Sequence, residues 1–190
     1  MKDKAWDKRR KIMTSALHLI AENGFHASPA AMIARNAGVG VGTLYRYFKN
    51  KDALIREIYM QVRQDMDDII YRDYSEELPV RDRFMGIFTA RVKYLLAHPD
   101  TYKFLEQYHH SPYYFNKKRE KSASDEALFT DLLDYAKSRH IVKDMDNKIL
   151  CAIAFGPILF LFKEHLTGSV RLDDELGGKM AGACWDALKF

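Results

Sequence analysis

Apolar residues recur every three or four positions along nearly the whole chain, a pattern that predicts α-helices and gives no convincing strand. The first such segment runs through Ile12, Leu17 and Ile20 and ends at Asn23-Gly24, a pair typical of a helix C-terminus. Longer helices are expected over residues 52–74, 79–97, 99–110, 126–139, 146–166 and 173–188, and a polar stretch from Asn116 to Asp125 separates two of them. We therefore predict an all-α protein with about nine helices.

Two short helical segments follow the first one and flank Gly38. Ser28-Pro29 is expected to open the first of them, as a hydroxyl N-cap followed by a first-turn proline. Glycine lets the chain reverse sharply at Gly38, so the pattern predicts a helix-turn-helix within a three-helix head. Six apolar residues are predicted to fill the core of this head: Leu17, Ile20, Ile33, Val39, Leu44 and Phe48.

The opposite face of the third helix suits entry into the DNA major groove. Small residues at its N-terminal end let the backbone approach base edges, while hydroxyls and a cation can contact phosphates. The N-terminal end of the helix also has a positive dipole that favours the sugar-phosphate chain. The residues predicted on this face are Val41, Gly42, Thr43, Tyr45, Arg46 and Tyr47.

Charge is distributed unevenly along the 190 residues, although the formal net charge is only +4. Residues 1–51 contain 10 of the 30 Lys and Arg residues but only three acids, Asp3, Asp7 and Glu22. The remaining residues are slightly acidic. A basic head on an acidic body favours an anionic polymer as partner of the head, although a solvated charged face would give the same count.

Residues 12–58 resemble the DNA-binding domain of TetR-family regulators, through Ala-Glu-Asn-Gly-Phe at 21–25, Ile-Ala-Arg-Asn-Ala-Gly-Val at 33–39 and Gly-Thr-Leu-Tyr-Arg-Tyr-Phe-Lys-Asn-Lys-Asp-Ala-Leu at 42–54. The resemblance implies double-stranded operator DNA as partner. It also implies that five residues touch phosphates or base edges: Ser28, Thr43, Tyr45, Tyr47 and Lys51.

Three residues of this predicted surface depart from the family pattern. Gly40 stands where the family commonly has a serine that caps the recognition helix, so a weaker cap is expected. Val41 replaces a polar or basic residue and could contact a thymine methyl group instead. Pro29 stands where the family often has threonine.

The predicted body, residues 52–190, follows the head, residues 1–51, and the helix from Asp52 to Tyr74 is expected to link them. The body is rich in aromatic residues, and most of them must form its core. Flat rings and tyrosine hydroxyls also suit an aromatic or amphipathic effector, for which Glu106 could supply a counter-charge. The candidate residues for binding a small-molecule effector are Phe88, Phe104, Tyr108, Tyr113, Phe129 and Phe155.

The segment from Ile149 to Phe162 is apolar on nearly all sides, so a helix there needs cover on more than one face. Contact with a second copy of the chain explains this pattern, and a fully buried monomer core is the alternative. The run is shorter than the ~20 residues of a membrane span, and Pro157 is expected to interrupt it. The predicted homodimer interface comprises Ala152, Gly156, Leu159, Cys184 and Leu188.

The sequence contains no motif typical of catalysis, cofactor binding or metal binding. His109 and His110 are adjacent, so on a helix they point about 100° apart and do not chelate one ion together. Cys151 and Cys184 lack metal-ligand spacing and are expected to be reduced thiols of a cytoplasmic protein.

Together these patterns predict a cytoplasmic, homodimeric repressor that a small ligand releases from a near-palindromic operator. Two alternatives stay open at this point. One is an all-α enzyme or ligand carrier whose basic head is incidental, which DNA retention in a mobility-shift assay would exclude. The other is a regulator that responds to a protein partner through its acidic body.

Overall fold

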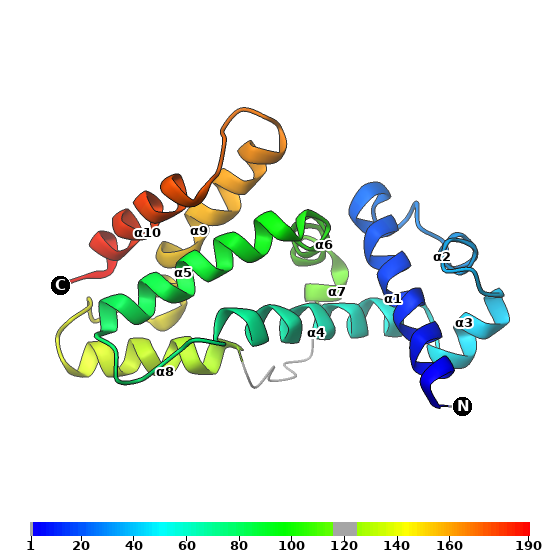
Figure 1. Cartoon of the computed structure of the whole chain (residues 1–190), viewed down its shortest axis with the longest axis horizontal. Coiled ribbons are helices and arrows are strands. Elements are labelled where there is room, and N and C mark those ends of the chain that lie inside the picture. Colours follow the sequence, from blue (N-terminus) through cyan, green and yellow to red (C-terminus); the bar gives the residue numbers. More distant parts are fainter. Residues whose placement is uncertain (1, 116–124) are drawn as a thin grey trace. The chain divides into compact units, whose positions relative to one another are not determined.

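A computed structural model describes residues 2–115 and 125–190, and within them the chain is helical apart from its connecting segments (Figure 1). An isolated antiparallel bridge joins Val142 and Lys189, and no strand forms in this part of the chain. The all-α prediction is therefore confirmed. The helices are α1 (Lys2–Asn23), α2 (Ala30–Asn36), α3 (Val41–Tyr47), α4 (Lys51–Ile70), α5 (Val80–Ala97), α6 (Pro99–His109), α7 (Pro112–Phe115), α8 (Asp125–Ser138), α9 (Asn147–Leu166) and α10 (Asp174–Leu188).

The six longer helices whose two ends are predicted agree with these bounds to within four residues. The largest difference is at the end of α4, where Ile70 is followed by a turn in place of the helix expected as far as Tyr74. The short helix α7 was not predicted. The predicted polar stretch from Asn116 lies outside the described residues, except for Asp125, which begins α8.

The chain divides into two compact units, whose described residues are 2–64 with 98–115 and 65–97 with 125–190. We call them the N-terminal unit and the C-terminal unit. The N-terminal unit contains α1 to α3, most of α4, and also α6 and α7, because α6 packs against α1. The predicted functional boundary after residue 51 remains a prediction, since compactness alone does not define which part binds DNA.

The N-terminal unit has one hydrophobic core, to which α1 to α4 and α6 all contribute. Four of the six residues predicted for this core, Ile20, Ile33, Leu44 and Phe48, are almost fully buried. Leu17 and Val39 are partly buried and pack against it. The core therefore fixes α3 on one side through Leu44 and leaves its other side available.

Gly38 forms the turn between α2 and α3, as the sequence predicts. Its φ of +67° is a left-handed conformation that disfavours residues with a Cβ. The Gly38 amide donates to the carbonyl of Arg35 at 3.1 Å, and the Val39 amide donates to that of Ala34 at 2.9 Å. This pair of bonds is the Schellman motif, which satisfies the last carbonyls of α2 as the chain turns into α3.

In the C-terminal unit, α10 packs against both α5 and α9 (Figure 1). A glycine on α10 permits the close approach to α5, because a Cβ built at Gly177 would lie 3.3 Å from a methyl carbon of Val92. Aromatic rings pack in the interior of this unit. They come from four helices and comprise Phe84, Phe88, Phe129, Phe155 and Trp185.

Helix α9 continues without interruption through Pro157, so the predicted break there is wrong. A proline inside a helix removes one amide donor, and its ring crowds the carbonyl one turn back, yet α9 tolerates both effects. By length and composition alone, α9 is long and apolar enough to cross a membrane. Several large apolar side chains of α9 are exposed, namely Ile149, Leu159, Phe160 and Leu166.

Candidate DNA-binding surface

Gly40 precedes helix α3; it has an extended backbone and forms the N-cap without a side-chain hydrogen bond. The Gly40 carbonyl accepts from the amides of Thr43 at 2.9 Å and Leu44 at 3.2 Å. Glycine has no side chain with which to cap the helix, so the weaker cap expected from the sequence is confirmed. Since α3 has no side-chain cap, the burial of Leu44 in the core contributes to holding the helix in place.

The two faces of α3 differ as the sequence predicts. Leu44 is fully buried, whereas Tyr45 is 49% exposed one position later. Gly42 and Arg46 are also exposed, as is Val41, while Thr43 and Tyr47 are half-buried. The guanidinium of Arg46 lies over the Tyr47 ring at 5.6 Å from its centre. Hydroxyls, one cation and small residues of α3 are therefore exposed or half-buried, while Leu44 packs in the core.

The side chain of Ser28 does not lie on this surface, which corrects the prediction that it touches DNA and caps α2. Ser28 is 0% exposed, and its hydroxyl hydrogen-bonds the carbonyls of Leu19 at 3.0 Å and Gly24 at 2.8 Å. The N-cap of α2 is Pro29, whose carbonyl accepts from the amides of Met32 and Ile33. Ser28 thus stabilises the α1–α2 turn, while Pro29 is exposed.

Lys51 lies at the start of α4, where its ammonium donates to the carbonyl of Phe25. Burial lowers the pKa of this ammonium, and the neighbouring carboxylate of Asp52 partly offsets the effect. Asn50 caps the helix by accepting from the Ala53 amide at 2.8 Å. Lys51 therefore fixes the α1–α2 turn through its bond to the Phe25 carbonyl.

Sequence reasoning missed Arg9, which connects three helices of the N-terminal unit. Its guanidinium pairs with the carboxylate of Glu57 on α4 and lies 5.5 Å from the ring centre of Phe48, just after α3. The partners are 39 and 48 positions away along the chain, so no local pattern indicates the contact. Arg9 holds the end of α3 against α1 and α4.

Polar contacts also join α6 and α7 to the head. Asp100 and Lys103 on α6 pair with His18 at 2.7 Å and Glu22 at 2.6 Å on α1. The Gln107 amide donates to the Ala21 carbonyl at 3.2 Å. The Tyr113 hydroxyl hydrogen-bonds Asp52 at 3.1 Å, and burial, with this bond, raises its pKa to about 12. The start of the predicted body is therefore bonded directly to α1 and α4.

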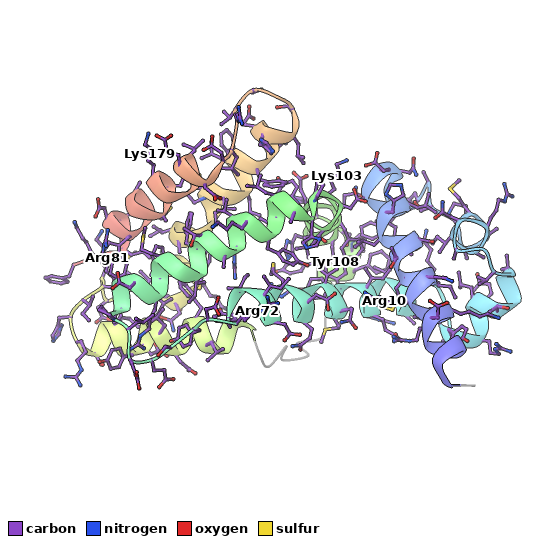
Figure 2. The ribbon with its side chains drawn as sticks, viewed as in Figure 1. Arg10, Arg72, Arg81, Lys103, Tyr108 and Lys179 are labelled. Atoms are coloured by element: carbon purple, nitrogen blue, oxygen red, sulfur yellow. The ribbon has the colours of Figure 1, made fainter. Side chains whose placement is uncertain are left out.

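The six aromatic residues predicted to bind an effector fall into two separate clusters. Phe104, Tyr108 and Tyr113 lie in the N-terminal unit, where Tyr108 (labelled in Figure 2) stacks on Tyr59 with 4.1 Å between the ring centres. Phe88, Phe129 and Phe155 lie in the C-terminal unit. They cannot line a single small pocket within either unit, because each unit holds only half of them.

A charged side chain accompanies the second cluster. The guanidinium of Arg91 on α5 lies over the ring of Phe155, 4.0 Å from its centre. Phe88 and Phe129 are buried, while Phe155 is half-buried. A separate cavity of about 310 Å³ lies between the end of α4 and α5, and none of the predicted aromatic residues lines it.

The predicted dimer residues also separate into two groups. Ala152, Gly156 and Leu159 are exposed on α9. Cys184 and Leu188 on α10 are 5% and 0% exposed, because they pack inside the protomer, and this corrects their assignment to an interface. Burial raises the pKa of the Cys184 thiol, which keeps it protonated. Among the described residues no group of three or more His, Cys, Asp or Glu is placed to hold a metal ion.

Two family models match the chain in succession. Residues 12–58 match the family described as bacterial regulatory proteins, tetR family, and residues 59–190 match the tetracyclin repressor-like C-terminal domain. The fatty acid metabolism regulator protein of Bacillus subtilis is 34% identical over 88 residues, which are 46% of this chain and 45% of that protein. The chain thus aligns with less than half the length of this relative.

Solved structures show the same fold over the full length. A TetR-family transcription regulator from Marinobacter aquaeolei has a TM-score of 0.89 at 24% identity, covering 100% of this chain and 99% of that one. A TetR-family protein from Vibrio parahaemolyticus has a TM-score of 0.81 at 27% identity, covering 96% and 99%. Because the two family models together extend from residue 12 to the end of the described chain, this protein belongs to the TetR family of bacterial regulatory proteins.

Proposed function

We propose that this protein is a DNA-binding transcriptional regulator that acts in the cytoplasm as a homodimer on a near-palindromic operator. The observation that supports this most strongly is the division of α3 into a buried face at Leu44 and an exposed face at Tyr45 and Arg46. An exposed helix of this composition, held after a glycine turn by a core that α1 to α4 and α6 share, suits the major groove. The operator residues proposed are Pro29, Gly40 to Tyr47 except Leu44, and Lys51.

The proposed dimer face is on α9. Phe160 is 64% exposed and Leu159 51% exposed, with Gly156 and Ala152 on the same exposed side. Exposed apolar side chains of this size are costly in water, and a second copy of the chain would cover them. A two-fold dimer would also present two copies of α3, which is what a palindromic operator requires.

We further propose that the regulator is a repressor and that a planar, amphipathic ligand releases it. A ligand can do so only if it binds the DNA-incompetent state better than the competent one. The bonds from α6 and α7 to α1 and Asp52 would couple a ligand-induced change to DNA binding. A displacement of α6 would act directly on the helices that hold α3. Coupling of this kind is typically about 1–3 kcal/mol.

The test combines DNA binding with transcription. The purified chain is mixed with DNA from upstream of its own and neighbouring genes in a mobility-shift assay, and the retained fragment is placed before a reporter gene. We expect retention of one or a few fragments and lower reporter output when the chain is present. Absence of retention would favour the enzyme or carrier alternative, and higher output would make the protein an activator.

Ligand release is tested by thermodynamic linkage. Candidate planar compounds are screened for those that raise the melting temperature, and each hit is titrated with and without saturating operator. Because coupling is reciprocal, operator must weaken ligand binding by the factor by which the ligand weakens operator binding. Equal ligand affinities in both titrations would exclude the compound as an effector.

A further inference from the structure

A second basic surface lies in the N-terminal unit, outside the face of α3. It is an open groove of about 900 Å³ between the first half of α1 and the turn that precedes α3. We call it the α1 groove. Ten residues line it: Asp7, Lys8, Arg10, Lys11, Thr14, Ser15, Asn36, Ala37, Gly38 and Val39.

The charge of the α1 groove is positive, since three cations face one carboxylate. Asp7 pairs with Lys11 at 2.8 Å, and both side chains are more than half exposed. Lys8 and Arg10 supply the remaining charge and are also exposed (Arg10 is labelled on α1 in Figure 2). Long, solvated cations around an open groove suit a polyanion that passes through it, and do not suit a small molecule that must be enclosed.

The position of the groove relative to α3 indicates which polyanion fits. One wall consists of residues 36–39, and α3 begins only two positions later at Val41. The seven residues of α3 extend about 10 Å, close to the ~12 Å width of the major groove, whose two edges are phosphate backbones. Lys51 follows the C-terminal end of α3, so cations lie beyond both ends of this helix.

We propose that the α1 groove binds the phosphate backbone at the operator edge opposite Lys51, with Lys8 and Arg10 as the phosphate-contacting residues. This inference rests on the proposed function, because it requires α3 to occupy the major groove. Contacts to phosphates position a protein on DNA without distinguishing its sequence. Lys8 and Arg10 therefore raise affinity for all duplexes and leave the preference for the operator unchanged.

The test measures operator affinity as a function of salt for the full-length chain and a Lys8→Gln/Arg10→Gln variant. Each phosphate contact contributes about 0.9 to the slope of log affinity against log salt. Two residues in each of two heads should therefore make the slope shallower by about 3–4. Binding to an unrelated duplex should weaken by the same factor as binding to the operator.

Two control variants separate this effect from others. Arg81→Gln removes one exposed cation from α5 in the C-terminal unit and should leave the slope unchanged. Thr14→Ala changes an uncharged, exposed residue of the same groove and should also leave it unchanged. All the altered side chains are exposed, so each variant should have the melting temperature of the unaltered chain. Equal melting temperatures would show that the variants are folded.

The possible outcomes are distinct. An unaltered slope in the Lys8→Gln/Arg10→Gln variant, with the unaltered chain binding its operator, would overturn the α1 groove alone. A loss of operator preference without a change of slope would also overturn the proposal for the α1 groove, because Lys8 and Arg10 would then contact base edges and not phosphates. If the unaltered chain retained no DNA at any salt concentration, both the proposed function and this inference would fail.

Discussion

The opposite environments of Leu44 and Tyr45, one position apart on α3, give a sharp prediction. Leu44 is 0% exposed and belongs to the core that α1 to α4 share. Truncating such a leucine removes its packing and leaves a cavity, at a cost of about 2–5 kcal/mol. For a chain of this length, that loss corresponds to a fall in melting temperature of roughly 4–20 °C. Leu44→Ala should therefore destabilise the fold.

Tyr45→Ala should have the opposite profile. Tyr45 is 49% exposed, and surface substitutions usually change stability by less than ~0.5 kcal/mol. A lost base-edge contact would cost about 1–3 kcal/mol for each head. That loss lowers operator affinity by roughly 5–150-fold per head.

Calorimetry and fluorescence anisotropy with labelled operator measure the two quantities on the same samples. Met60→Ala, which truncates an apolar side chain of α4 that is 50% exposed, serves as the matched surface control and should change neither. A large fall in melting temperature for Tyr45→Ala, together with none for Leu44→Ala, would refute the assignment of the two faces.

Three further predictions follow from particular contacts. A Cβ at Gly156 meets no atom within 4 Å inside the protomer, so Gly156→Glu should spare the fold but place a costly charge in the proposed dimer face. Ultracentrifugation should then show monomer at micromolar concentration, whereas the control Gly86→Glu, at an equally open position on α5, should stay dimeric. A dimeric Gly156→Glu variant would exclude α9 as the dimer face. Burial raises the pKa of the Tyr113 hydroxyl from its ordinary 10.0 to about 12, so the protonated form stabilises the fold below pH 10 and this contribution is lost as the pH rises toward 12; Tyr113→Phe, which cannot titrate, should show a shallower loss of melting temperature over that range, and identical profiles would contradict the argument. Phe155→Ala should reduce the effect of a releasing ligand while operator affinity without ligand stays the same in an anisotropy titration, and an undiminished ligand effect would place the effector site elsewhere.

The local features of this fold follow from local sequence signals. The glycine turn at Gly38 and the buried face of α3 depend on residues a few positions apart, so spacing and residue type were sufficient to predict them. The bounds of most helices were predictable for the same reason.

Contacts between distant segments were not predictable in this way. Ser28 fits an N-cap by type, yet its hydroxyl bonds to carbonyls four and nine positions earlier, and only the path of the turn decides this. Leu188 has the periodicity of an interface residue, but the same periodicity serves the packing of α10 on α5 and α9. The division of the aromatic residues between two units likewise depends on α6 packing against α1, which no spacing along the chain indicates.

Two copies of α3 are proposed to occupy successive major grooves of one operator. Hydroxyl-radical footprinting of the full-length chain on its retained DNA fragment tests this most directly. We expect two protected regions with two-fold symmetry, with centres one helical turn apart, about 34–36 Å, or a multiple of that distance. In the Tyr45→Ala variant both regions should weaken together. A single unsymmetrical region, or protection that is unchanged in the Tyr45→Ala variant, would contradict the account.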